Sequence, residues 1–281
     1  MSYRFSALTP NVVDAAALLA RPSANRLFVD ARLGEPADEY RSYRDQHIHG
    51  AVHAQIRDVF ASPANAATGN LPLPDVPGLQ VQLRAWGVNT KTEIIVYGPS
   101  LALAARGWWT LRWAGAQNVR VLDGGMREWI AQGGAVAQGD YQPRLEQQGA
   151  PIILTPGQLP QIELAELEHS LPQHTLIDAR DEASFDQGHL PRALNLPSTE
   201  QWTPSGRLRT VAELRERYRA LGILTGQDAV VYCGGGVLSA LSALLLDALG
   251  VQTRLYVGSW SEWAKSPERI ALGLHAAKES A

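Results

Sequence analysis

The sequence predicts an α/β protein made of two similar domains, each a mostly parallel sheet with helices on both faces. Three observations lead to this prediction. Short apolar segments alternate with segments whose apolar residues recur at helical spacing. Five short motifs in the first half of the chain return in the same order in the second half. The 281 residues are 45% hydrophobic and 19% charged, which supplies enough apolar side chains for packed cores.

The repeated motifs divide the chain into two copies. In the first half they are Leu27–Arg32, His47–Ala51, Ile94–Tyr97, Leu122–Gly125 and Glu128-Trp129. In the second half they are Leu176–Arg180, Gly188–Ala193, Ala229–Tyr232, Tyr256–Ser259 and Glu262-Trp263. We therefore predict one domain over residues 1–145 and a second over residues 155–281. The join, between about Gly134 and Pro160, is rich in Gly, Pro and Gln and has little apolar periodicity.

Each copy alternates strands with helices. Apolar residues recur at helical spacing over residues 79–86 and 101–112 in the first copy, and over 214–221 and 238–249 in the second. A segment at 63–77, rich in Pro, Asn and Gly, predicts a loop inside the first copy. Ligands of parallel sheets bind beyond the carboxyl ends of the strands, so we expect the site there.

Cys233, the only cysteine in the chain, directly follows the apolar segment 229–232, and glycines separate it from the predicted helix. A strand that turns through glycines into a helix directs backbone N–H groups at one point, which favours an anion there. We expect Cys233 to act as a nucleophile, although a cysteine after an apolar strand often serves only in packing. The residues expected to bind substrate through their backbone are Gly234, Gly235, Gly236, Val237 and Leu238.

The first copy has no nucleophile at the matching place. When Tyr97 is aligned with Tyr232, Gly98 stands opposite Cys233, and Pro99 removes a backbone donor. The sequence thus predicts a catalytically inactive first domain and one active site per chain. We expect the first domain to cover and shape the second site, because pockets commonly lie where two domains meet.

Composition excludes several classes of function. A net charge of −3 gives no electrostatic case for nucleic acid or an anionic membrane as a partner. No apolar run approaches the roughly 18 residues of a spanning helix, and the N-terminus lacks the layout of a signal peptide. A single cysteine forms no internal disulfide and fits a reducing, cytoplasmic location. The seven histidines show no paired spacing, so we predict neither a metal nor a cofactor.

The ordered motifs resemble those of the tandem-domain rhodaneses, the family of thiosulfate and 3-mercaptopyruvate sulfurtransferases. The resemblance extends from about residue 8 to about residue 270 and rests on the duplicated Asp-Ala-Arg motif, the two histidine turns, Leu-Asp-Gly-Gly, residues 256–263 and the Cys233 turn. It implies that the Cys233 thiolate takes a sulfane sulfur from a small donor and becomes a persulfide. A thiol, cyanide or a thioredoxin-like protein then accepts the outer sulfur.

The residues after Cys233 bear on the choice of donor. Family members selective for thiosulfate tend to carry basic side chains there, whereas those for 3-mercaptopyruvate tend to have Cys-Gly-Ser/Thr-Gly-Val-Thr. Here the turn is Cys-Gly-Gly-Gly-Val-Leu, without a cation and without the hydroxyls at 235 and 238. The resemblance therefore favours 3-mercaptopyruvate, with thiosulfate as the alternative. Ser239 stands one place further along and is not expected to reach the sulfur.

The resemblance also implies further site residues. Counting back from the His-Ile-His-Gly turn assigns a catalytic aspartate and histidine of the first domain to Asp38 and His47, although a histidine in a repeated turn is more often a structural hydrogen-bonding group. Arg180 is the main candidate for binding the donor anion, and it equally fits a structural pair with Asp178 or Glu182. An insertion with a second arginine is missing, and Ser184 stands near that place. The other candidate cations are Arg192, Arg207 and Arg209.

Two other functions fit the Cys233 turn less well. A thiolate phosphatase uses a similar anion cradle with an arginine six places after the cysteine, but Ser239 occupies that place here. A non-enzymatic carrier would only relay a persulfide between partner proteins, and the sequence leaves that alternative open.

Overall fold

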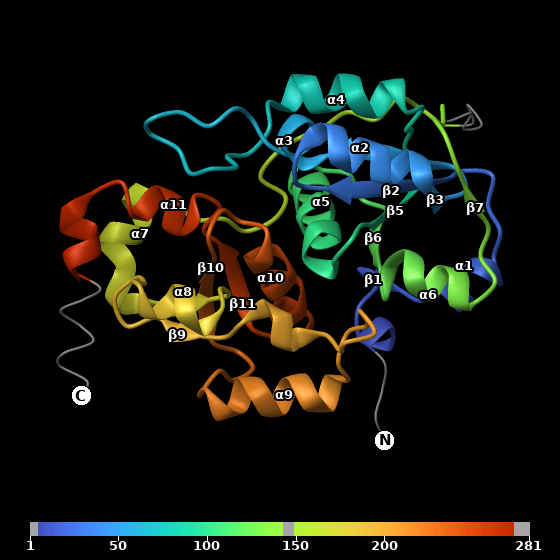
Figure 1. Cartoon of the computed structure of the whole chain (residues 1–281). Helices are drawn as coiled ribbons and strands as arrows, with labels where there is room; N and C mark the ends of the chain where they lie inside the picture. The colour runs from blue at the N-terminus through green and yellow to red at the C-terminus, as the bar shows by residue number, and fades with distance from the viewer. Residues whose placement is uncertain (1–4, 143–148, 273–281) are drawn as a thin grey trace.

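Two parallel sheets, one from each half of the chain, form the framework of the structure (Figure 1). In this computed structural model, which describes residues 5–142 and 149–272, the first sheet has the order β1-β6-β5-β2-β4 and the second the order β11-β10-β8-β9. The first sheet consists of β1 (Val12–Val13), β2 (Arg26–Arg32), β4 (Ala51–Gln55), β5 (Glu93–Tyr97) and β6 (Val119–Leu122). The second consists of β8 (Thr175–Asp178), β9 (Leu194–Asn195), β10 (Asp228–Tyr232) and β11 (Gln252–Leu255).

The strand order confirms the duplication. Strands β6-β5-β2-β4 of the first unit correspond in order to β11-β10-β8-β9 of the second, and their pairs are parallel. A small antiparallel pair of β3 (His47–Ile48) with β7 (Val136–Ala137) is added to the first unit. The predicted fold, two mostly parallel α/β units, is therefore confirmed.

Helices cover both faces of the sheets. In β2, Leu27, Val29 and Ala31 belong to one buried cluster and Phe28 to another, which is the alternation expected of a strand buried on both faces. The first unit contains η1 (Phe5–Ala7), α1 (Ala15–Leu19), α2 (Pro36–Asp45), α3 (Ile56–Val59), α4 (Val76–Ala85), α5 (Leu101–Trp113) and α6 (Gly125–Ala131). The second contains α7 (Leu164–Ser170), η2 (Leu171–Gln173), α8 (Glu182–Asp186), η3 (Ser198–Gln201), α9 (Val211–Ala220), α10 (Leu238–Ala248) and α11 (Ser259–Trp263). Within the described ranges, no helix has the length and apolar character needed to cross a membrane.

Helices α5 and α10 pack against each other between the two sheets. Both are buried around most of their circumference, as the apolar sequences of these segments require. One hydrophobic cluster runs through this contact, with Ala104 and Leu111 on α5 and Leu241 and Leu245 on α10. Since each helix directly follows a central strand, this packing brings the carboxyl end of β10 close to the first unit.

The connection between the units follows the first unit before it reaches the second. The Thr155 N–H donates to Ala114 O at 2.8 Å and the Gln158 N–H to Trp113 O at 3.0 Å. The Ile162 N–H then donates to Leu255 O at 3.1 Å, on the second sheet. The boundaries at 145 and 155 stay predictions, because residues 143–148 lie outside the described residues, as do the first four residues of the N-terminus considered above.

Candidate active site

Cys233 begins the turn between β10 and α10 and is buried, with 1% of its surface exposed. Its Sγ accepts a hydrogen bond from the Gly236 N–H at 3.1 Å and a second from the Ser239 hydroxyl at 3.4 Å. Among the five predicted binding residues, Gly236 thus directs its amide at the sulfur. Ser239 also reaches it, contrary to the expectation from spacing, because it lies in the first turn of α10, which begins beside the sulfur.

The three glycines of the turn have different surroundings. Gly236 has a φ of +81°, and a Cβ there would lie 2.8 Å from Arg106 Nη1 and 2.9 Å from Val257 O. Only glycine fits that position. A Cβ on Gly234 would meet nothing within 4 Å, and one on Gly235 would lie 3.7 Å from the nearest atom, on Asn70. Open space therefore lies on the Gly234–Gly235 side of the turn.

Helix α11 fixes the other side of the turn. The Cys233 N–H donates to Ser259 Oγ at 3.2 Å, and the Trp260 N–H donates to Cys233 O at 2.9 Å. Ser259 adopts a φ of +55°, uncommon for a residue other than glycine, and its hydroxyl donates to Tyr256 O at 2.9 Å. These bonds hold the backbone at Cys233 in one conformation.

A loop of the first unit, residues 61–71, extends over α11 (Figure 1). The Asn70 N–H donates to Ser261 Oγ at 2.9 Å. The Lys265 ammonium donates to Asn65 O at 2.7 Å and to Ala66 O at 3.1 Å, and it also contacts Thr68 O. The segment predicted as a loop thus covers the second unit beside the Cys233 turn.

Arg106, on α5 of the first unit, is the charged residue of this site that sequence reasoning missed. Its side chain is fully buried. Nη2 donates to Phe60 O at 3.0 Å and to Leu71 O at 2.9 Å, at the two ends of the loop, and Nη1 donates to Gly236 O at 3.4 Å. Burial lowers the pKa of Arg106 to about 10, and the charge of Cys233 acts in the opposite direction. The available signal was an arginine within the otherwise apolar helical segment 101–111.

Arg180 is bound by residues of its own unit, the second. Nη2 lies 2.5 Å from Asp178 Oδ2, Nε lies 3.0 Å from both oxygens of that carboxylate, and the guanidinium stacks over the Trp260 ring at 4.9 Å. The structure therefore has the pair with Asp178 that the sequence left open beside a role in anion binding. Of the other candidate cations, Arg209, just before α9, pairs with Glu213 on that helix, and Arg192 is exposed.

Arg207 connects the two units. It lies 2.8 Å from Asp14, 3.1 Å from Asp123 and 3.0 Å from Glu128, all in the first unit. Three carboxylates surround this guanidinium, so it is not available to a donor anion. This candidate for substrate binding is instead an ion-paired contact between the domains.

The structure does not bring Asp38 or His47 to Cys233. Asp38 is exposed on α2 and pairs with Arg41 at 3.0 Å. His47 is buried on β3, where its Nδ1 contacts Tyr43 O at 3.0 Å and its ring stacks on Tyr43 at 4.2 Å. In Figure 1, β3 and α11 lie on opposite sides of the first unit. The segment of the first unit that contacts α11 beside the turn is instead the later loop 61–71.

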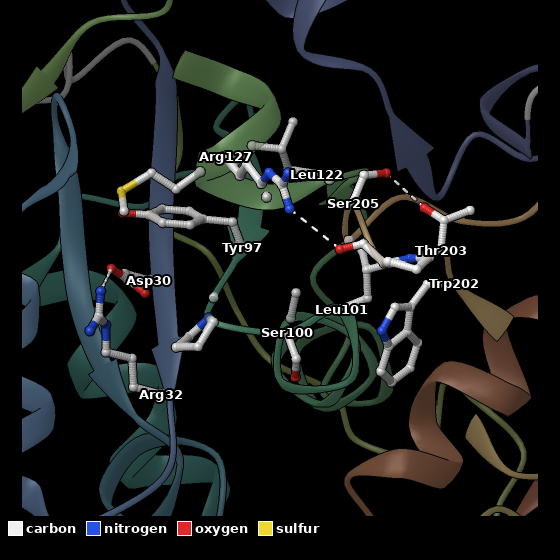
Figure 2. A pocket seen from close by; sticks show the side chains of 18 of the residues that line it. Asp30, Arg32, Tyr97, Ser100, Leu101, Leu122, Arg127, Trp202, Thr203 and Ser205 are labelled. Atoms are coloured by element: carbon white, nitrogen blue, oxygen red, sulfur yellow. Dashed lines mark hydrogen bonds and ion pairs between the residues drawn. The ribbon is translucent and has the colours of Figure 1, made fainter. Parts of the chain in front are cut away.

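The first unit keeps a cavity at the place that corresponds to the Cys233 turn (Figure 2). It has a volume of about 500 Å³ and is lined by Asp30 and Tyr97 at the strand ends, by Gly98, and by Trp202–Gly206 of the second unit. The turn from β5 to α5 has three residues (98–100), against five (233–237) in the second unit. Gly98 supplies no nucleophile at this place.

Comparisons with known proteins agree with this arrangement. A sequence model of the Rhodanese-like domain matches residues 13–132 and 161–266. A Pseudomonas aeruginosa protein named a probable 3-mercaptopyruvate sulfurtransferase is 36% identical over 281 residues, covering 92% of this chain and 95% of that protein. The 3-mercaptopyruvate sulfurtransferase of Escherichia coli is 32% identical over 259 residues, 84% of this chain and 88% of that protein. The crystal structure of the 3-mercaptopyruvate sulfotransferase SseA from Escherichia coli has a TM-score of 0.74 at 30% identity, covering 90% of this chain and 100% of that one.

Proposed function

This chain belongs to the rhodanese-like domain family, and we propose that it is a sulfurtransferase that moves a sulfane sulfur from 3-mercaptopyruvate to a thiol or cyanide acceptor through a persulfide on Cys233. The observation that carries the proposal is the pair of donors, the Gly236 N–H at 3.1 Å and the Ser239 hydroxyl at 3.4 Å, directed at the sulfur of the sole cysteine. Donors fixed before the reaction stabilise a sulfur anion without reorganisation.

In the proposed reaction, the Cys233 thiolate attacks the sulfur of the donor. The carbon–sulfur bond breaks, and its electron pair goes to the enolate of pyruvate, which takes the donor's thiol proton. The outer sulfur of the new persulfide carries the negative charge. An acceptor thiolate or cyanide then attacks that outer sulfur and leaves the Cys233 thiolate as it was at the start.

Three features support 3-mercaptopyruvate as the donor. The turn at 233–238 carries no cationic side chain to bind the doubly charged thiosulfate. The Ser239 hydroxyl supplies a donor to the sulfur although the turn lacks hydroxyls at 235 and 238. Two relatives that match most of the chain carry the name of 3-mercaptopyruvate sulfurtransferases, and another is named a putative thiosulfate sulfurtransferase. Thiosulfate remains the second donor to be tested.

The proposal requires a reduced Cys233, which fits the cytoplasm as the site of action. The acceptor is a small thiol, cyanide or a thioredoxin-like protein, and none of these needs a metal. Across the described ranges, His, Cys, Asp and Glu side chains form no group placed to hold a metal ion. The functional residues we propose are Cys233 as nucleophile, with Gly236 and Ser239 as donors to its sulfur.

Intact mass spectrometry tests the proposal directly. We expect the purified protein to gain one sulfur atom after exposure to 3-mercaptopyruvate, and the Cys233→Ser variant to gain none. Loading with thiosulfate in parallel identifies the preferred donor by rate. If neither donor loads a Cys233 that still reacts with an alkylating agent, the enzymatic proposal fails, and a carrier that receives its sulfur from a protein takes its place.

A further inference from the structure

Arg106 is a fully buried cation without a carboxylate partner in the described part of the chain. Its Nη atoms donate to three backbone carbonyls, and its Nε has no hydrogen-bond partner there. A buried charge without an opposite charge is strongly unfavourable, because carbonyl dipoles replace only part of the lost hydration. An anion close to the guanidinium would therefore stabilise the buried side chain.

Cys233 is an ionisable residue that, like Arg106, is hydrogen-bonded to the backbone of Gly236. Other charged side chains near the turn are directed elsewhere. On α11, Glu262 interacts with Tyr256, and Lys265, just after that helix, binds loop carbonyls. Beyond β8, Arg180 is paired with Asp178. A sulfur anion on Cys233 is thus the partner available to the buried guanidinium.

Gly236 links the two groups. Its N–H donates to Cys233 Sγ at 3.1 Å, and its carbonyl accepts from Arg106 Nη1 at 3.4 Å. A Cβ on this residue would lie 2.8 Å from the same nitrogen, so the guanidinium packs directly beneath the turn. Any shift of Arg106 would therefore move the residue whose amide holds the sulfur.

We propose that Arg106, supplied by the unit that lacks a nucleophile, is the counter-ion of the sulfur anion on Cys233 and a positioning residue that holds the Gly236 amide against it. The charge favours both the thiolate and the persulfide, because each carries one negative charge at nearly the same place. The inference deepens the proposed function. Its statement about the persulfide rests on the proposed sulfur transfer, whereas its statement about the thiolate can be tested in a protein that transfers no sulfur.

The test is the pH profile of Cys233 alkylation by iodoacetamide, which is unambiguous because the chain has one cysteine. We expect the midpoint of the profile to rise by about one pH unit or more in Arg106→Met, so that alkylation below both midpoints slows about tenfold. Arg106→Lys should recover most of this loss, since it keeps the charge. Arg112→Met is the matched control, because Arg112 lies on the same helix and donates to the backbone carbonyls of Ala116 and Gln117.

An Arg106→Met profile that coincides with the wild-type profile overturns the proposal, as does an equal shift in Arg112→Met. If Arg106→Met does not fold, the wild type is compared with Cys233→Ser by thermal melting between pH 6 and pH 9. A thiolate stabilised in the folded state makes the wild-type advantage grow as the pH rises toward about 8.5, where an unfolded thiol ionises. A constant difference overturns the proposal. Sulfur loading by mass is measured separately, so a failed transfer proposal is distinguished from a failed counter-ion proposal.

Discussion

Tyr97 and Tyr232 occupy the same position in the two units and make the same bond. The Tyr97 hydroxyl accepts from the Ile48 N–H at 3.0 Å, and the Tyr232 hydroxyl accepts from the Leu190 N–H at 3.0 Å. Each tyrosine ends a central strand and holds the turn that follows a histidine. The units diverge at the next residue, where one has a glycine and the other Cys233. The two tyrosines therefore serve the same structural purpose, and the difference between the units that bears on the proposed reaction is the residue that follows each tyrosine.

Gly236→Ala should abolish sulfur loading. The left-handed φ and the 2.9 Å approach of Val257 O leave no room for a methyl group, so the turn must move, at a cost of about 2 kcal/mol or more. Intact mass after exposure to 3-mercaptopyruvate measures the loss. Gly234→Ala is the control, since a Cβ there meets nothing within 4 Å, and equal loss in both variants contradicts the argument.

Ser239→Ala should slow persulfide formation about tenfold, which corresponds to about 1.4 kcal/mol for a long hydrogen bond to a charged sulfur. The hydroxyl is 3.4 Å from Cys233 Sγ. Single-turnover loading, followed by mass, measures the rate. Ser242→Ala, on the same helix, removes a hydroxyl that accepts from Gln201 at 2.8 Å and should leave the loading rate unchanged. A wild-type rate in Ser239→Ala would remove this residue from the site.

Gly235→Ser should fold normally and load 3-mercaptopyruvate at least as fast as the wild type. The nearest atom to a new Cβ is 3.7 Å away, on Asn70, so the side chain fits without displacement. The hydroxyl restores the pattern of the mercaptopyruvate type at this position. Loading rates with 3-mercaptopyruvate and thiosulfate give the selectivity, and a selectivity that shifts toward thiosulfate contradicts the proposed donor.

Arg207→Met should destabilise the protein by about 2–4 kcal/mol at pH 7, because it removes a cation that contacts three carboxylates. Burial raises the pKa of Asp123, and Arg207 opposes this. Without Arg207 that pKa rises further. A carboxyl group whose pKa is raised by folding contributes stability at pH values below its ordinary pKa, and this contribution is lost as the pH rises. The deficit of the variant should therefore be small near pH 4 and grow toward pH 7, as urea unfolding at several pH values will measure.

Asp38→Asn should leave both stability and sulfur loading unchanged, since Asp38 is exposed and its pair with Arg41 is a surface ion pair. His47→Gln should lower the melting temperature, because the ring is buried against Tyr43, without changing the loading rate of the folded protein. A loading rate that falls in either folded variant restores that residue to the catalytic machinery.

The sequence predicted what depends on order along the chain. Strand and helix alternation, the duplication and the turn at Cys233 are local patterns, and the structure has each of them. Which side chains reach the turn depends instead on which segments of the chain meet in space. Counting along the chain assigns Asp38 and His47 to the site, whereas in the structure the later loop 61–71 lies beside the turn. From its spacing, Ser239 is not expected to reach the sulfur, but it lies in the first turn of α10, where its hydroxyl points at Cys233 Sγ.

Arg106 could not be assigned by any local pattern. Its role depends on the packing of α5 against α10, which places a side chain of one unit 3.4 Å from the backbone of a turn 130 residues later. The sequence of α5 shows an arginine among apolar neighbours, but it does not indicate which groups that arginine contacts. The same holds for Arg207, whose three carboxylates lie in the other unit.

The position of Arg106 also bears on how a duplicated gene can evolve. A copy without a nucleophile would ordinarily be free to accumulate mutations or to be deleted. Here that copy supplies the guanidinium beneath Gly236, the loop over α11 and the helix that packs on α10. Deleting it would expose the apolar face of α10 and remove the support of the remaining reactive turn. The two copies therefore cannot be separated without cost to this turn, and a sequence change in either copy bears on the same site.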